Sequence, residues 1–201
     1  MLHGRRVAPL SIDLSHVHRR SVTSLFSNLV TRPTGRAIRS GVESQIAEMD
    51  GGAHSVCLSV LDFSQVRVLD YSCADEIVAK LLLRFQAEDR PAEAYFVVRG
   101  LQDHHLEAVE AVLERHALLL VCETEDGTCA LIGAADPLQR AVWDTLLRLR
   151  RAGPAQVAGE AGVSDAAAAA AMSALCVRRV AAPHSDGTVS PLPCLLEPTA
   201  P

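Results

Sequence analysis

The sequence lacks any apolar run long enough to cross a membrane. Its longest uncharged apolar stretches are residues 117–122 and the alanines at 166–171, whereas a membrane-spanning helix needs about 20 such residues. The first residues also lack the apolar core and small-residue cleavage site of a secretory signal, although two arginines lie among them. We therefore expect a cytoplasmic protein with no membrane partner.

Sequence motifs of the common enzyme classes are missing as well. The chain has no G-x-S-x-G nucleophile elbow, no Walker phosphate loop and no G-x-G-x-x-G dinucleotide fingerprint. Asp62, Asp70 and Asp75 are expected near the C-terminal ends of strands, where ligands of α/β proteins often bind, but no set of metal ligands accompanies them. We expect no enzymatic activity and no cofactor.

The cysteines and histidines show no metal-binding spacing. Six cysteines are present without a C-x-x-C pair, and most lie in apolar runs, where a thiol behaves as a small hydrophobic side chain. We expect them to be reduced core residues. The histidines at 16–18 and 104–105 have no cysteine or carboxylate at ligand spacing, so no metal site is predicted.

Positive charge is concentrated near the N-terminus. Residues 1–40 hold seven arginines against Asp13 alone, a net charge of +6. Because the net charge of the whole chain is −5, the remaining residues carry −11. A basic segment on an acidic body suggests an anionic partner or an intramolecular contact. The candidate anion site is the start of a helix that Thr34 is expected to cap, and it consists of Arg32, Thr34, Gly35, Arg36 and Arg39. The alternatives are that Arg36 and Arg39 form a solvated helix face, or that the anion belongs to the acidic part of the same chain.

Strands and helices are predicted in alternation along most of the chain. Strands are expected at 7–14, 55–63, 65–71 and 92–100, helices at 21–30, 35–49, 73–88 and 101–117, and a hairpin at 118–133. Strands separated by helices indicate an α/β domain with helical crossovers. Residues 135–151 then predict one amphipathic helix, and two further helices and a hairpin turned at Asp186-Gly187 follow it.

These patterns divide the chain into four segments. Residues 1–53 form a basic strand and helix segment that packs on the sheet, residues 54–134 form the α/β domain, residues 135–196 form a small helical domain with a hairpin, and residues 197–201 form a frayed tail.

The stretch LDFSQVRVLDYS at 61–72, between an apolar strand and a helix, resembles the STAS domain of bacterial anti-anti-sigma factors and sulfate transporters. The resemblance covers residues 55 to 133. It implies a mixed sheet with helical crossovers, a partner of the kinase or sigma-regulator type, and phosphorylation of the serine at the position of Ser72. The flanking loop would consist of Asp62, Asp70, Tyr71 and Asp75. The family's Gly-Leu-Gly is replaced here by Cys73-Ala74-Asp75.

The residues themselves allow two roles for Ser72. Its hydroxyl can cap the helix, with Asp75 as the acid of a capping box, a contribution of about 1 kcal/mol. Alternatively it is a regulatory site. A phosphate there would be favoured by the positive end of the helix and opposed by the neighbouring Asp70, Asp75 and Glu76.

The segment QVAGEAGVS at 156–164, followed by a predicted helix at 165–180, resembles the winged-helix domains of bacterial regulators. The resemblance spans residues 137–192. Base readout needs Arg, Lys, Asn, Gln, Ser or Thr at the exposed start of the second helix, and this helix offers Asp165 and six alanines. Residues 135–201 also balance six arginines against six acids. A role in packing or protein contact is therefore favoured over DNA binding.

Two functions follow from these features. The favoured one is a non-enzymatic regulatory protein that acts by protein-protein interaction through the STAS-like domain, with a possible switch at Ser72. The alternative is a transcriptional regulator whose winged-helix domain binds DNA.

Overall fold

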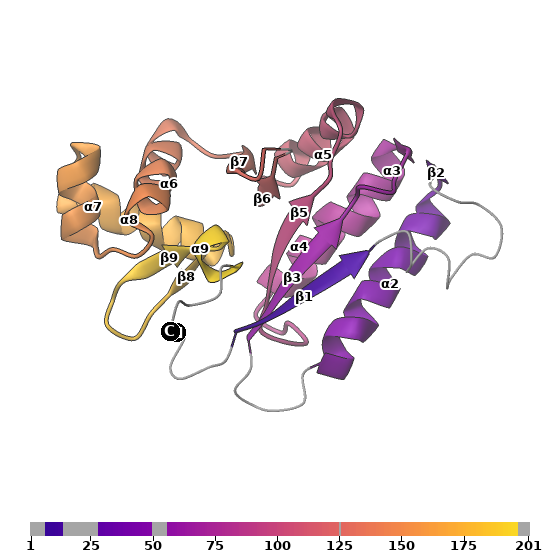
Figure 1. Cartoon of the computed structure of the whole chain (residues 1–201), viewed down its shortest axis with the longest axis horizontal. Coiled ribbons are helices and arrows are strands. Elements are labelled where there is room, and N and C mark those ends of the chain that lie inside the picture. The colour runs from indigo at the N-terminus through magenta and orange to yellow at the C-terminus, as the bar shows by residue number, and fades with distance from the viewer. Residues whose placement is uncertain (1–6, 14–27, 50–55, 125, 197–201) are drawn as a thin grey trace.

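A computed structural model describes residues 7–13, 28–49, 56–124 and 126–196. Its centre is a five-stranded sheet in the order β1 (Val7–Asp13), β3 (Val56–Asp62), β5 (Ala94–Arg99), β6 (Leu119–Glu123) and β7 (Cys129–Gly133). The first four strands are parallel, and β7 runs antiparallel to β6 (Figure 1). The predictions of an α/β fold and of a mixed sheet with helical crossovers are confirmed.

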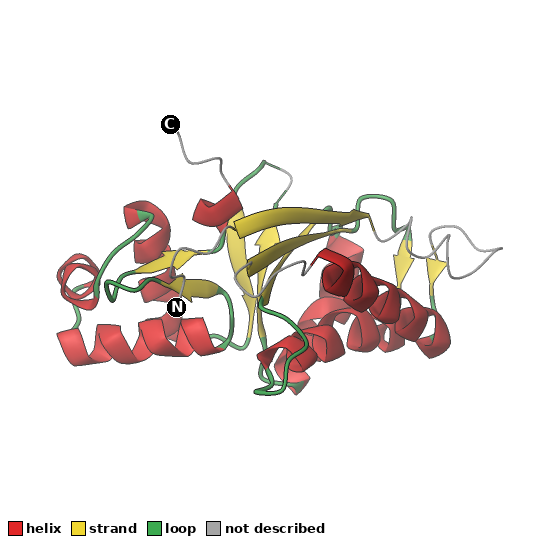
Figure 2. Cartoon of the chain, turned by 90° about the horizontal axis from the view of Figure 1, so that it is seen from below, coloured by secondary structure: helices red, strands yellow, loops and turns green. Residues whose placement is uncertain are grey.

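One face of the sheet is covered by helices from the first part of the chain (Figure 2). These are α2 (Arg32–Met49), a continuous helix formed by α3 (Tyr71–Ala74), η1 (Asp75–Ala79) and α4 (Lys80–Gln86), and α5 (Asp103–Arg115). Their apolar side chains share a core with Leu61, Phe96, Val98 and Leu120 of the strands. The η1 segment has π-helical geometry, a distortion that is often found at functional sites.

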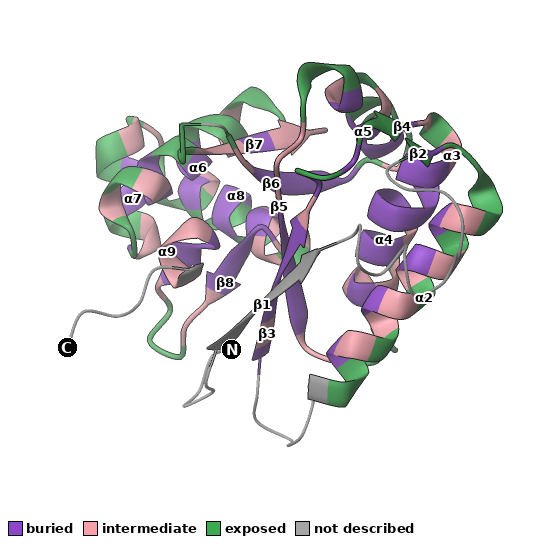
Figure 3. Ribbon diagram, turned by 45° about the vertical axis from the view of Figure 1, so that its right-hand side comes forward, coloured by how far each residue is buried: buried purple, intermediate pink, exposed green. Residues whose placement is uncertain are grey.

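The opposite face is covered by the C-terminal unit. It contains α6 (Pro137–Leu149), α7 (Pro154–Ala161), α8 (Asp165–Val177), the hairpin of β8 (Ala181–Pro183) and β9 (Val189–Pro191), and α9 (Pro193–Leu196). Trp143, Leu146 and Leu175 of this unit share a second core with Tyr95 and Val97 of β5. Because both faces of β3, β5 and β6 are buried, the sequences of these strands are mostly apolar instead of alternating (Figure 3).

Polar contacts also join the C-terminal unit to the sheet. The Arg179 guanidinium lies 4.2 Å from the ring centroid of Tyr95, and it donates hydrogen bonds of 2.9 Å to the Ala94 carbonyl and to Glu93. The Gln86 amide of α4 donates to the Arg178 carbonyl at 3.1 Å. The segment after α8 therefore contacts both β5 and α4.

Two element predictions are corrected. The strand expected at 65–71 is only Val68–Leu69 (β4), and it pairs with β2 (Asn28–Leu29) in a separate two-stranded sheet. The helix expected at 21–30 falls mostly outside the described residues, and its described end forms β2. The β2–β4 pair is therefore not part of the five-stranded sheet.

Candidate functional site

Asp70, not Ser72, caps the helix that begins at Tyr71. Asp70 has extended backbone angles, and its carboxylate accepts a hydrogen bond of 2.8 Å from the backbone N–H of Cys73. The Ser72 hydroxyl lies inside the first turn and donates to the same carboxylate at 2.9 Å. The prediction that Ser72 is the cap is wrong, because an acceptor at position 70 reaches the orphan N–H three residues on. Asp75 does not act as a capping-box acid either, since its side chain binds Arg32 and His116.

Asp62 lies at the end of β3 and is held by an ion pair. Its carboxylate is 2.7 Å from the guanidinium of Arg99, which ends the neighbouring strand, and it accepts a hydrogen bond of 2.9 Å from the Ser64 backbone. Burial disfavours its ionised form, but the hydrogen bonds from Ser64 and Arg99 outweigh burial, and the pKa of Asp62 is lowered. This carboxylate fixes the loop that leads to β4.

Two adjacent carboxylates, Asp75 and Glu76, are buried in the π-helical segment. Glu76 is fully buried, and Asp75 is 5% exposed. Arg32 binds both, at 2.8 Å to Asp75 and 3.1 Å to Glu76, and Lys80 binds Glu76 at 2.5 Å. Burial opposes ionisation of both groups, but the hydrogen bonds from Arg32 to Asp75 and from Lys80 to Glu76 prevail, and both pKa values are lowered.

The arginines predicted to bind an anion therefore face carboxylates of the same chain. Arg39 lies 3.5 Å from Glu76 and Arg36 lies 4.0 Å from it, so the anion is the acidic part of the same chain, one of the alternatives that the sequence allowed. The helix begins at Arg32, earlier than predicted, and the Thr31 hydroxyl accepts the Thr34 backbone N–H at 3.3 Å, so Thr34 is not the cap.

Gly35 has a packing role in this contact. A Cβ at this position would lie 3.0 Å from the Cys73 Cα and 3.0 Å from the Glu76 Cβ. The missing side chain lets α2 approach the helix formed by α3 and η1 closely enough for Arg32 to reach both carboxylates. Gly35 is buried in this helix contact and presents no open surface to a ligand.

Residues that the sequence analysis did not select complete the network. His116 contacts Asp75 at 2.9 Å through Nε2, and Arg115 donates a hydrogen bond of 2.9 Å to the Tyr71 hydroxyl. Glu76 and Lys80 are spaced by four residues, a signal for an ion pair on a helix. No sequence signal marks Glu76 as buried, because its burial results from the packing of α2.

Exposed apolar side chains lie on the β4–α3 segment that contains Ser72 and next to β2, which pairs with β4. Among the described residues, the large apolar side chains that are exposed are Val30, Val68, Tyr71, Leu83 and Val177. Val68 lies on the outward side of the β2–β4 pair, opposite the buried Leu29 and Leu69, and Val30 directly follows β2. Tyr71 follows at the first position of α3. We call Val30, Val68, Tyr71 and Ser72 the Ser72 surface.

The C-terminal unit contains a helix pair and a hairpin. Helices α7 and α8 meet at 110° through a turn in which Gly162 adopts a left-handed conformation (φ 68°) and Ser164 caps α8. The exposed residues of α8 are Asp165, Ala166, Ala169, Ala170, Ser173 and Val177. None of them is Arg, Lys, Asn or Gln, so the exposed face of this helix is uncharged apart from Asp165.

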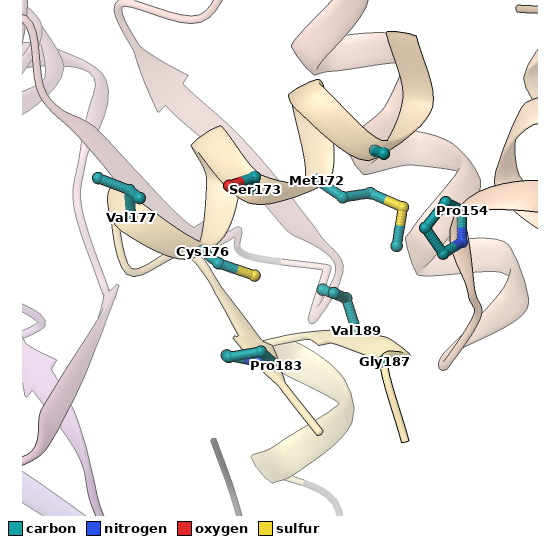
Figure 4. Close-up of a pocket in the computed structure, with 9 residues that line it drawn as sticks. Pro154, Met172, Ser173, Cys176, Val177, Pro183, Gly187 and Val189 are labelled. Carbon is teal, nitrogen blue, oxygen red and sulfur yellow. The ribbon is translucent and has the colours of Figure 1, made fainter. Parts of the chain in front are cut away.

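An apolar groove of about 420 Å³ lies between α8 and the hairpin. Figure 4 shows Met172 and Cys176 of α8 directed toward Pro154, Pro183 and Val189. Burial raises the pKa of the Cys176 thiol to about 11, so this cysteine is protonated at neutral pH and not a reactive thiolate. The groove has the character of a packing surface.

The remaining site predictions concern metals, thiols and membranes. Within the described ranges, no group of three or more His, Cys, Asp or Glu side chains is arranged to hold a metal ion. All six cysteines lie in these ranges and none forms a disulfide. No single helix in the described part of the chain is both long and apolar enough to cross a membrane, and α7 and α8 satisfy that test only as a bent pair.

Comparisons with known proteins give no relative: no family model, curated protein or solved structure matches the chain.

Proposed function

We propose that this chain is a non-enzymatic regulatory protein of the cytoplasm that binds a partner protein through the Ser72 surface. In this proposal residues 54–134 are a STAS-like domain, and the C-terminal unit is a winged-helix-like domain used for packing and protein contact. The partner is of the kinase or sigma-regulator type. The order of elements around LDFSQVRVLDYS supports the first assignment, and the α7–α8 pair with its hairpin supports the second.

The observation that carries the proposal is the exposure of Val30, Val68 and Tyr71. Their exposed fractions are 45%, 43% and 37%. Clustered apolar side chains at the surface typically mark a contact with another macromolecule. The nearby carboxylates are engaged in fixing structure: Asp70 caps a helix, Asp62 binds Arg99, and Asp75 binds Arg32. This engagement favours a docking surface over a catalytic one.

The proposal is tested by capture of a partner with a matched pair of variants. Val68→Ser removes an apolar side chain from the Ser72 surface, and Leu83→Ser removes one of similar exposure, 40%, from α4. A protein from the native host that binds wild type and the Leu83 variant but not the Val68 variant is the expected result. Equal binding to all three forms, or none to any, contradicts the proposal.

Regulation at Ser72 forms a separate part of the proposal. The Ser72 hydroxyl donates to Asp70, and a phosphate there would lose this bond and add a charge of about −1.5 to −2 beside the carboxylate. We expect Ser72→Asp to weaken partner binding while Ser72→Ala leaves it unchanged. Mass spectrometry of the protein from its native host would detect the modification, and an unmodified Ser72 together with unchanged binding of the Asp variant contradicts the switch.

DNA binding is the second candidate function, favoured by the 110° crossing of α7 and α8. Its weakness is the exposed face of α8, which lacks cationic and amide side chains. Arg178 and Arg179 follow this helix, but they bind Ala134 and Glu93. A gel-shift assay at low salt with genomic fragments separates the two functions, since sequence-selective retention would favour the DNA reader.

A further inference from the structure

We propose that the partner segment that docks on the Ser72 surface is acidic, and that it is recognised by arginines around that surface. This inference rests on the proposed function and adds the chemistry of the partner. It comes from the placement of arginines on the elements that flank the start of α3.

Arginines lie on three segments that adjoin the Ser72 surface along the chain or by contact. Arg32 and Arg36 lie in the first turns of α2, which packs beside α3. Arg67 is exposed and directly precedes Val68. Arg115, at the end of α5, donates to the Tyr71 hydroxyl. The four arginines thus belong to α2, to the segment before β4 and to α5.

Arg36 and Arg115 are the members of this set best able to bind a new anion. Arg32 already makes short ion pairs with two buried carboxylates. Arg36 is 64% exposed, and its contact with Glu76 is 4.0 Å. Arg115 is exposed and donates to a neutral hydroxyl. A carboxylate of a partner would gain both arginines without breaking a short ion pair.

The carboxylate contacts of these two arginines are weak, because Arg36 lies 4.0 Å from Glu76 and Arg115 donates to a neutral hydroxyl. Asp70 is occupied by the Cys73 N–H and the Ser72 hydroxyl, and Asp75 by Arg32 and His116. Glu114 is the exposed acid adjacent to Arg115 in the sequence, and it would oppose an acidic partner. Charge complementarity therefore selects a segment with carboxylates beside an apolar residue that contacts Val30 and Val68.

A nucleic acid is the less favoured occupant. The centre of the surface is formed by aliphatic valines, which offer a phosphate backbone no hydrogen bonds. A short acidic peptide uses both the arginines and the apolar centre.

The test measures binding of a short fluorescein-labelled peptide of alternating glutamate and leucine by fluorescence anisotropy. We expect saturable binding to wild type that weakens on raising NaCl from about 50 to about 300 mM, because exposed charges are screened. Arg36→Glu/Arg115→Glu should weaken binding about tenfold or more, and Glu114→Gln should strengthen it. Arg32 is left intact because its loss would leave buried carboxylates unpaired.

Matched controls make the outcome specific. Arg84→Glu/Arg148→Glu carries the same charge change on α4 and α6, where these arginines contact Asp89 and Glu160, and should bind like wild type. A lysine-leucine peptide should not bind. No saturable binding of the acidic peptide, equal binding by both double variants, or equal binding of the lysine peptide overturns the inference, and tighter binding of an oligothymidine replaces it with nucleic-acid recognition.

Failure of the inference is distinguishable from failure of the proposed function. A captured partner that requires Val68 but tolerates Arg36→Glu/Arg115→Glu contradicts the acidic segment alone. A captured partner that tolerates both Val68→Ser and Arg36→Glu/Arg115→Glu contradicts the docking surface as a whole.

Discussion

Asp70 and Ser72 lie two residues apart at the start of α3, and their hydrogen bonds assign them different roles. Asp70 accepts from the Cys73 N–H and the Ser72 hydroxyl. Both residue types are good helix caps, so the sequence alone does not distinguish them. Because Asp70 is the cap, Ser72 lies half-buried in the first turn, beside the exposed Tyr71.

Substitutions at these two positions should differ in stability. Asp70→Ala removes the cap and is expected to lower the free energy of unfolding by about 1 kcal/mol, whereas Asp70→Asn keeps an accepting oxygen and costs less. Ser72→Ala, which removes a donor only, should cost less than Asp70→Ala. Urea denaturation measures all three, and a larger loss for Ser72→Ala would show that Ser72 is the cap.

The buried pair Asp75 and Glu76 predicts a dependence of stability on pH. Their folded-state pKa values lie below the ordinary values of 3.8 and 4.5. The unfolded chain therefore binds protons first as the pH falls, and the stabilisation present at neutral pH is lost below about pH 4.5. Replacing Glu76 by Gln should cost about 3 kcal/mol at pH 7 and flatten the pH dependence between about pH 5 and 3.

Denaturation of wild type and Glu76→Gln at several pH values measures this effect. Glu43→Gln is the control, because Glu43 pairs with Arg39 from a partly exposed position on α2 and should change stability by less than about 0.5 kcal/mol. Parallel pH curves for wild type and Glu76→Gln would contradict a stabilising role of the buried charge.

Most helices and strands can be predicted from local patterns in the sequence, but the contacts between them cannot. Local patterns predicted the apolar strands, the α5 and α6 helices and both hairpins, because apolar residues recur in each at the spacing of its secondary structure. The start of α2 was misplaced, since Thr34 was expected to cap the helix, whereas the helix begins at Arg32. Proline is tolerated in a first turn, and Arg32 is held there by Asp75 and Glu76, residues more than 40 positions away.

The close contact of α2 with α3 and η1 makes a prediction about Gly35. A methyl group here would meet the Cys73 Cα and the Glu76 Cβ at 3.0 Å, and backbone atoms cannot move aside cheaply. Gly35→Ala should therefore lower stability by about 1–2 kcal/mol although alanine is the better helix former. Gly159→Ala in α7, where nothing lies within 4 Å, should instead raise stability by about 0.5–1 kcal/mol. Thermal denaturation of both variants tests the pair, and a stabilising Gly35→Ala would contradict the close approach.

The chain as a whole is built in three layers, with the sheet between two helical layers that belong to different parts of the sequence. The sequence did not identify the C-terminal unit as the cover of the second face. A DNA-reading surface does not explain the alanines of α8, because alanine cannot read bases. Ala168 and Ala171 are buried in the second core with Tyr95 and Val97, so part of this tract serves to pack the C-terminal unit.

A shared sheet predicts that both layers unfold together. The chain contains a single tryptophan, Trp143, and it is buried in the second core, whereas Ile77 is fully buried in the first. Ile77→Ala should cost about 2–4 kcal/mol through the cavity it leaves. If the molecule is one cooperative unit, this loss shifts the unfolding transition seen by Trp143 fluorescence as much as that seen by circular dichroism. A Trp143 transition that stays in place while circular dichroism detects an earlier one would show that the C-terminal unit folds independently of the sheet it covers.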